Sequence, residues 1–353
     1  MDYVIRDVES LESVVGRQPL AAIMKSIARL DDHCSSILEH ATAAVMAYVD
    51  FEGVPRIGVI GGEAGFARPM GAAHLAFAVP TTRAADGSSA ALLFLTPGWR
   101  ESLRVNGRID DTGLAVEEAF VHCGKAMIRS AIWSSPDPRA NSPRIEAPVG
   151  GVVDDEDVVS ESERIDETQR AFLSKSPFAV IGSCDGDGRA DASPKGDPPG
   201  FLRVLDDHTI ALPDRPGNRR TDTFHNLLER PAVTLLAMTP GDDRVVEMRG
   251  RARLSVDPVL LAAMAVKDQV PKIAVVIDVD YSALRLCDAM KKADLWNPER
   301  HIPANTLPRA AKIWSDHVKS SERRGLTARA VRTGVSEAAL RAGIAVDYRQ
   351  NLY

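Results

Sequence analysis

The chain has 353 residues, of which 44% are apolar and 26% charged, and its net charge is −6. This length allows two domains with separate cores, and the negative charge disfavours a nucleic-acid or anionic-membrane partner. The apolar stretches fall far short of the roughly 20 residues that a membrane span requires. The four cysteines are widely separated, without CxxC or Cys/His spacing, which argues against a zinc or iron–sulfur site. We expect a cytoplasmic protein with free thiols and no bound metal.

The predicted elements are short strands with a smaller number of helices. Residues 1–40 carry apolar side chains at helical spacing, and from Ala43 the chain changes to short β-rich runs between Gly and Pro turns, as in small barrels. Later strands are predicted at 178–184, 209–212, 233–238, 245–254 and 273–279, and later helices at 165–175, 221–228, 258–266, 283–295 and 307–340. The Pro-rich, acidic residues 134–162 between these groups are typical of a linker.

A long internal repeat relates the two halves of the chain. Residues 30–66 and 165–201 align without a gap, and the second copy is later longer by eight residues. Identical residues include Asp31/Asp166, Asp50/Asp185, Gly53/Gly188, Gly61/Gly196 and Phe66/Phe201, and Thr96-Pro97-Gly98 matches Thr239-Pro240-Gly241. We infer a duplicated domain, with copies at 1–133 and 163–300, the linker at 134–162 and a helical tail at 301–353.

Polar residues of the second copy predict an anion site. Residues 188–201 contain three prolines and three glycines, which predicts an irregular loop that presents Ser193 and Lys195. A second cluster precedes the predicted helix at 221–228 and comprises Arg215, Asn218, Arg219 and Arg220. Backbone N–H groups at a helix N-terminus and arginine side chains together favour phosphate. The alternative is a solvated basic face without a ligand.

These motifs resemble the FMN-binding split-barrel flavoproteins related to pyridoxamine 5′-phosphate oxidase. In that family a Ser-Arg-Lys-type cluster holds the FMN phosphate, and Asn218-Arg219-Arg220 occupies its place. Residues 191–201 are similar to a subgroup of the family. The resemblance implies a mainly β protein with helices (α+β). It would contain two tandem FMN-binding split β-barrels that form an intrachain pseudo-dimer, followed by the helical tail.

The same subgroup has a second half-motif, which resembles residues 97–108 and 117–133 and is kept only in the first copy. Because family members hold flavin between two subunits, the resemblance implies one composite FMN site per chain. The second copy would bind the phosphate through Ser193, Lys195, Arg215, Asn218, Arg219 and Arg220. The first would form the ring and substrate wall with Arg104, Asn106, His122, Lys125, Arg129 and Trp133. Placed on one helix, His122, Lys125 and Arg129 would share a face, and these are the candidate catalytic residues.

The resemblance favours an FMN-dependent oxidoreductase that transfers hydride or electrons to an unidentified small molecule, with NAD(P)H as a candidate reductant. Three alternatives concern the whole protein: non-catalytic flavin binding, haem binding and F420-dependent reduction. Others concern single residues, since His122 could be an ordinary hydrogen-bonded residue and Trp133, with its equivalent Trp296, could serve packing. For the basic segment 312–341 of the tail, the possible roles are an oligomer contact, a lid or a solvated helix face. The chain is expected to act as a monomeric pseudo-dimer or a homodimer.

Overall fold

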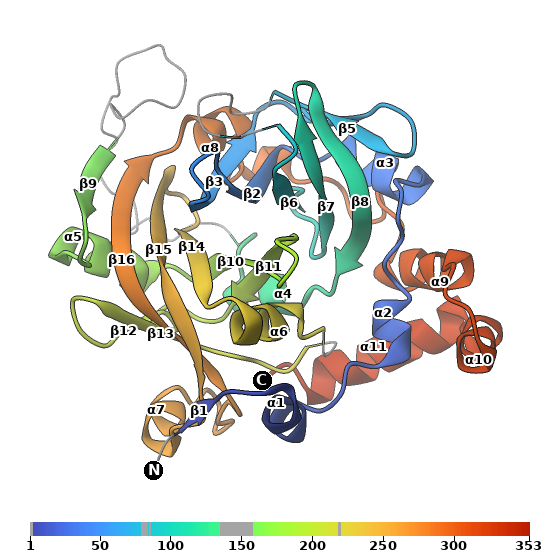
Figure 1. The fold of residues 1–353 in the computed structure, drawn as a ribbon. Helices are drawn as coiled ribbons and strands as arrows, with labels where there is room; N and C mark the ends of the chain where they lie inside the picture. Colours follow the sequence, from blue (N-terminus) through green and yellow to red (C-terminus); the bar gives the residue numbers. More distant parts are fainter. Residues whose placement is uncertain (1–2, 79–83, 85, 135–157, 218–219) are drawn as a thin grey trace.

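The computed structural model describes residues 3–78, 84, 86–134, 158–217 and 220–353. Two antiparallel sheets, surrounded by helices, make up this part of the chain (Figure 1). The main strand orders are β3-β2-β6-β7-β8-β5-β4 and β11-β10-β14-β15-β16-β13-β12. Each strand of the second sheet thus takes the place of its first-copy equivalent, which agrees with the inferred duplication. The predicted fold class, mainly β with helices (α+β), is confirmed.

The strands of the first sheet are β2 (Ala43–Val49), β3 (Pro55–Gly61), β4 (Arg68–Pro69), β5 (His74–Ala76), β6 (Ser89–Leu95), β7 (Ser102–Asp110) and β8 (Gly113–His122). Those of the second are β10 (Phe178–Cys184), β11 (Ala190–Gly196), β12 (Arg203–Val204), β13 (Thr209–Pro213), β14 (Ala232–Met238), β15 (Arg244–Ser255) and β16 (Ala274–Leu286). Two further strands join its margin, β1 (Val4–Ile5) beside β15 and β9 (Val158–Ser162) beside β16.

The helices lie around the sheets and along one side of the molecule. Those of the two copies are α1 (Val8–Val15), α2 (Leu20–Ile23), α3 (Asp32–Leu38), α4 (Lys125–Ser130), α5 (Glu167–Lys175), α6 (Asp222–Glu229), α7 (Pro258–Ala263) and α8 (Asp288–Ala293). The tail contains η3 (Pro298–Arg300), α9 (Ala310–Ser320), α10 (Leu326–Gly334) and α11 (Glu337–Gln350). Among the helices of the described residues, none is both long and apolar enough to cross a membrane.

The residues repeated in sequence build the same turn in both halves. Asp50 accepts backbone hydrogen bonds from the N–H groups of residues 52 and 54, and Asp185 accepts them from residues 187 and 189. Gly53 and Gly188 in these turns have φ values of +79° and +81°, a region that L side chains rarely adopt. The repeated pairs Asp50/Asp185 and Gly53/Gly188 are therefore explained by the strand–turn–strand unit alone.

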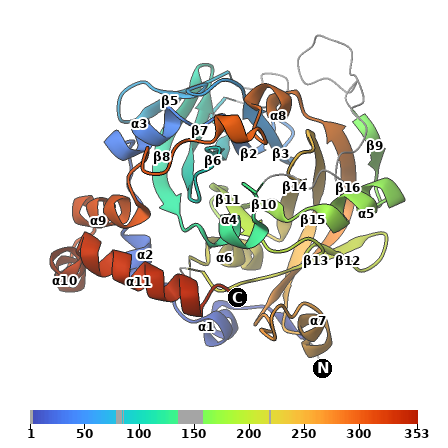
Figure 2. The same ribbon diagram turned by 180° about the vertical axis from the view of Figure 1, so that it is seen from behind.

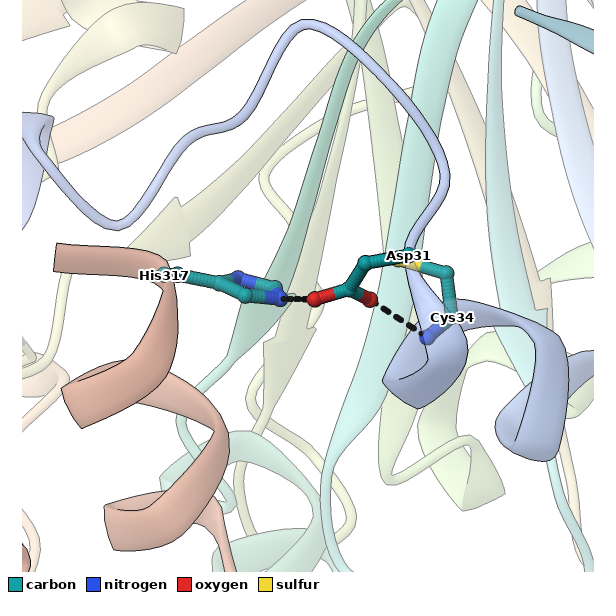
Figure 3. A group of neighbouring side chains, drawn as sticks. All are labelled: Asp31, Cys34 and His317. Carbon is teal, nitrogen blue, oxygen red and sulfur yellow. Dashed lines mark hydrogen bonds and ion pairs between the residues drawn. The ribbon is translucent and has the colours of Figure 1, made fainter. Parts of the chain in front are cut away.

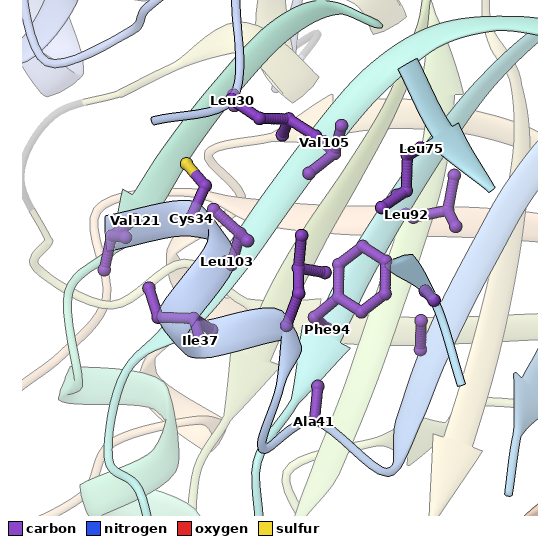
Figure 4. Packing of buried hydrophobic residues seen from close by; sticks show 14 of the residues in the cluster. Leu30, Cys34, Ile37, Ala41, Leu75, Leu92, Phe94, Leu103, Val105 and Val121 are labelled. Carbon is purple, nitrogen blue, oxygen red and sulfur yellow. The ribbon is translucent and has the colours of Figure 1, made fainter. Parts of the chain in front are cut away.

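The three largest apolar clusters of the described residues hold this fold together. In the first half, Ile37 and Cys34 of α3 pack over Phe94 and Leu103 of the first sheet (Figure 4). The second sheet has its own core, and a third cluster joins the two halves through residues such as Val45, Leu93, Val180 and Leu236, all fully buried. Burying an aliphatic side chain of this size stabilises the fold by about 1.5–3 kcal/mol. The seam between the sheets is thus a continuous core.

Two predicted elements differ from the structure. The irregular loop expected at 188–201 contains the strand β11, in spite of Pro194, because β11 is at the edge of its sheet and proline there breaks no ladder between two neighbours. The helix expected at 283–295 begins only at Asp288, since β16 continues to Leu286.

The domain limits also need adjustment at both ends. β1 and α1 lie against the second sheet, although their residues were assigned to the first copy: Val4 pairs with Ser255, and Leu11 belongs to the second core. The tail helix α9 instead packs on the first half through Ile313 and Trp314. Of the predicted linker, residues 135–157 lie outside the described part, and residues 158–162 form β9. The N-terminal segment thus packs on the second half, and the C-terminal tail packs on the first.

Candidate functional site

A cavity of about 500 Å³ lies between the two halves, bordered by α4, the end of β8, β11, α6 and the end of the tail. Small-molecule sites commonly have volumes of this order. The structure brings these predicted site residues together at its wall: Arg104, His122, Lys125, Arg129, Ser193, Lys195, Arg215 and Arg220. Asn218 and Arg219 lie outside the described residues. The described lining therefore draws on both copies, as expected for a composite site.

The structure places Asn106 and Trp133 away from this lining. Asn106 lines a neighbouring pocket and donates a 3.2 Å hydrogen bond to Glu118. Trp133 donates its indole N–H to the carbonyl oxygen of Trp99, and its ring lies 6.3 Å from that of Trp296. The packing role that was the alternative for Trp133 accounts for these contacts.

His122 is the last residue of β8, so the expectation that it shares a helix face with Lys125 and Arg129 is wrong. All three still line the cavity because α4 begins directly after the strand. Burial, with the positive charges of Arg104 and Arg220, holds the pKa of His122 well below its usual range, so the imidazole is neutral. Its Nε2 atom is buried and has no hydrogen-bond partner among the described residues.

Arg215 is bonded within the second half. Its guanidinium contacts the carboxylate of Asp197 at 2.7 Å, donates to the carbonyl oxygen of Met264 at 2.7 Å and donates to that of Gln269 at 3.4 Å. The side chain is only 4% exposed. Arg215 thus ties the end of β11 to the segment after α7, and its phosphate-binding role stays a prediction.

Arg104 and Arg220 belong to a buried charge network that crosses between the halves. Arg104 of β7 pairs with Asp191, with Asp222 at 3.1 Å and with Glu118 at 3.2 Å. Arg220 pairs with the same Glu118 at 2.7 Å and the same Asp222 at 2.5 Å. Both guanidiniums also lie over the ring of Phe120, 4.2 and 3.7 Å from its centroid. Both arginines are thus compensated by carboxylates, which sequence counting could not show.

Ser193 and Lys195 lie two residues apart on the edge strand β11, and side chains at that spacing share a face of a strand. Both line the cavity. The ammonium of Lys195 lies 3.2 Å from Asp214 and 5.2 Å from the ring centroid of Phe224. This corner combines a hydroxyl with a cation, the donor types that an anionic group requires.

The end of the tail closes the opposite corner. The ammonium of Lys125 lies 2.8 Å from Asp347 and donates to the carbonyl oxygen of Asn351 at 2.9 Å. Arg129 donates to the carbonyl oxygens of Gly196 and Leu352, both at 2.8 Å. The lid was one of three roles considered for the tail, but these tail residues follow no motif that could have marked them as part of a site.

One group of potential metal ligands lies outside the cavity. Asp31, Cys34 and His317 gather at the junction of α3 and α9, with ligand atoms within 4.8 Å of one another (Figure 3). His317 Nε2 lies 3.0 Å from the Asp31 carboxylate, and Nδ1 lies 3.1 Å from the carbonyl oxygen of Lys25. Both neighbours are oxygen atoms, so the ring of His317 connects the N-terminus of α3 to the segment before it. We assign this group an anchoring role for the tail.

Glu101, just before β7, provides a test of pH dependence. Burial raises its pKa to about 7. Because the folded state then binds the proton more tightly than the unfolded state, stability should fall as pH rises from about 4.5 to 7. We expect Glu101→Gln to remove this slope and to stabilise the protein at pH 8 by about 2 kcal/mol. Urea unfolding at pH 5 and 8 measures both effects, and the exposed Glu167→Gln is the control. Parallel pH profiles for wild type and Glu101→Gln would contradict the assignment.

Comparisons with known proteins concern the second half and the fold. A family model described as pyridoxamine 5′-phosphate oxidase matches residues 165–286. Similar solved structures include HupZ of Group A Streptococcus, at 16% identity, 34% of this chain, 98% of that chain and a TM-score of 0.29. General Stress Protein 26 of Bacillus anthracis has 12% identity, covers 33% of this chain and 89% of its own, and has a TM-score of 0.27. An F420 reductase has 16% identity, covers 33% of this chain and 94% of its own, and has a TM-score of 0.25. No curated protein matches the chain.

Proposed function

Because residues 165–286 belong to the pyridoxamine 5′-phosphate oxidase family, we propose that the chain is a flavin-dependent oxidoreductase with one composite FMN site. The observation that carries this proposal is the single cavity lined by Ser193 and Lys195 of one copy and by His122 and Lys125 of the other. The two sheets of identical strand order would be split barrels that form a pseudo-dimer within one chain. A second subunit would then not be needed to complete the site.

The residues present fit a bound flavin mononucleotide. The volume is adequate, and His122, a residue of the cavity wall, has a buried Nε2 without a hydrogen-bond partner among the described residues. Ser193, Lys195 and Arg220 would hold the phosphate, while Lys125 and Arg129 would lie along the ring or substrate wall. When bound, the flavin supplies hydride or electron transfer. The protein contributes positive charge for an anionic group and a neutral imidazole that can donate or accept a hydrogen bond.

The test is the absorbance spectrum and mass of the ligand in the purified protein, with its ratio to the chain after saturation with FMN. We expect one FMN per chain, reducible by NAD(P)H. F420 or haem would have a distinct spectrum and would redirect the cofactor assignment. Flavin that binds but is not reduced would favour a non-catalytic role. Two flavins per chain, or none, would contradict the composite site.

A variant at the phosphate corner tests the residues. Lys195→Met should weaken FMN binding by about 10- to 100-fold, since a hydrogen bond to a charged group contributes roughly 1.5–3 kcal/mol. Lys175→Met, at the exposed end of α5, removes the same charge away from the cavity and is the matched control. Equal FMN affinities for the two variants, measured by fluorescence titration, would remove Lys195 from the site.

A further inference from the structure

We infer that residues 347–352 occupy an oxyanion subsite of the cavity, so that this segment and an anionic ligand bind Lys125 and Arg129 in competition. The inference rests on the proposed function only for the presence of a ligand in the cavity. The competition itself is argued from the contacts of the tail. Figure 2 shows α11 running beneath α4 toward the end of the chain.

The groups that the tail offers are those of an oxyanion. The Lys125 side chain is only 1% exposed. Its ammonium pairs with the carboxylate of Asp347 and donates to the carbonyl oxygen of Asn351. Arg129 donates a hydrogen bond from one of its terminal nitrogens to the carbonyl oxygen of Leu352. Nearby, the backbone N–H of Gly124 donates to the hydroxyl of Tyr348 at 2.8 Å. Gly124 and Lys125 at the start of α4 and Arg129 in its last turn thus all donate to oxygen atoms of the tail.

The tail is less deeply buried in the protein than Lys125 and Arg129, the cations that it contacts. α11 contains no fully buried residue, and its apolar contacts come from partly buried side chains such as Leu340 and Ile344. Segments with few buried apolar contacts separate from a fold at low free-energy cost. By contrast, Arg215 and Lys195 pair with Asp197 and Asp214 of the second half itself. Among these four cavity cations, Lys125 therefore has the ion-pair partner that is easiest to displace. Arg129 shares its guanidinium between the tail and the second half, where it lies 3.9 Å from Asp197 and donates to Gly196.

Charge determines which class of ligand can replace the tail. A buried ammonium that loses its carboxylate partner is strongly unfavourable unless another negative group takes that place. A neutral ligand would leave Lys125 uncompensated once Asp347 departs. A carboxylate or a phosphate group restores both the charge and the hydrogen bonds. The subsite is therefore selective for an oxyanion-bearing ligand, and the tail raises the concentration of ligand needed to fill it.

Asp347→Asn in the full chain tests the competition, because the variant keeps the shape of the side chain and removes the charge. We expect it to bind phosphate or acetate about tenfold more tightly than wild type, within the 5- to 150-fold range of typical coupling between sites. Glu337→Gln, at the half-buried start of the same helix, removes the same charge without touching Lys125 and should leave the affinity unchanged. Calorimetric titrations with phosphate and with acetate distinguish the two kinds of oxyanion.

Hydrogen exchange supplies the second measurement. Phosphate or acetate should increase amide exchange over residues 340–353 of the wild type, at constant ionic strength set with chloride. Slower exchange would show that the tail closes over the ligand, and an equal effect of chloride would show only screening; either would overturn the inference. FMN binding with no change at residues 340–353 and no effect of Asp347→Asn would also overturn it while the proposed function stands. Displacement of the tail by phosphate in a protein that binds no flavin would instead support the competition and contradict the proposed function.

Discussion

Replacing Arg104 by methionine is expected to lower the free energy of unfolding by about 3–5 kcal/mol, the usual cost of removing one partner from a buried ion pair. The Arg104 side chain is only 3% exposed and neutralises Asp191, Asp222 and Glu118. Methionine preserves much of the side-chain length but removes the ion-pair partner of Asp191 and leaves Glu118 and Asp222 paired with Arg220. The large effect comes from the uncompensated charges, with lost packing as the smaller part.

Urea unfolding followed by circular dichroism measures this loss. Arg108→Met, on the same strand, is the matched control, because the Arg108 side chain is 47% exposed and pairs with an exposed Glu117. Such surface pairs contribute at most about 1 kcal/mol. The double variant Arg104→Met/Asp222→Asn should lose less than the sum of its single variants, since the two side chains interact. Similar losses for Arg104→Met and Arg108→Met would mean that the network is not a stability element.

The same substitution should also disturb the cavity. Arg104 comes from the first sheet, whereas Asp191 and Asp222 come from the second, so the network fixes the two walls relative to each other. Its charge also helps to keep His122 neutral, second only to burial. Arg104 thus acts on the cavity through its neighbours.

The repeat made most of the fold predictable. Residues such as Asp50 and Gly53 keep their identity in both copies because the turn needs a side-chain acceptor and a left-handed backbone. Pro194 misled the prediction, because a single proline breaks a strand only where both edges are paired, and the position of β11 in the sheet is a tertiary property. His122 was placed on a helix because the apolar residues before α4 do not reveal where β8 ends.

The cavity could be predicted from the sequence only in part. The residue types were sufficient to bring Ser193, Lys195, His122 and Lys125 to one place, since the repeat indicates which half of each copy carries chemistry. The charge of the cavity lining was not predictable, because the lining includes five carboxylates along with seven cations. Partners such as Asp197 for Arg215 arise from chain segments that meet only in the folded protein. The tail contacts are of the same kind.

His317→Ala is expected to destabilise the protein by about 3 kcal/mol and to loosen the tail. His317 is fully buried in α9 and bridges Asp31 of the α3 N-terminus and the carbonyl oxygen of Lys25. Alanine removes a buried ring and leaves two acceptors without this donor. His208→Ala, at an exposed turn, is the control, and limited proteolysis should cut residues 310–353 faster only in the His317 variant.

The dependence of stability on acidic pH tests the contact between His317 and Asp31 more specifically. Burial acts to raise the pKa of Asp31, but hydrogen bonds from His317 and from the backbone of Cys34 outweigh it and hold the pKa well below its ordinary value. A depressed carboxyl pKa stabilises the fold above the unfolded value of about 3.9, and this contribution is lost as pH falls below it. His317→Ala should therefore differ from wild type most above pH 4, and the gap should narrow toward pH 2. A constant gap across this range would mean that His317 stabilises by packing alone.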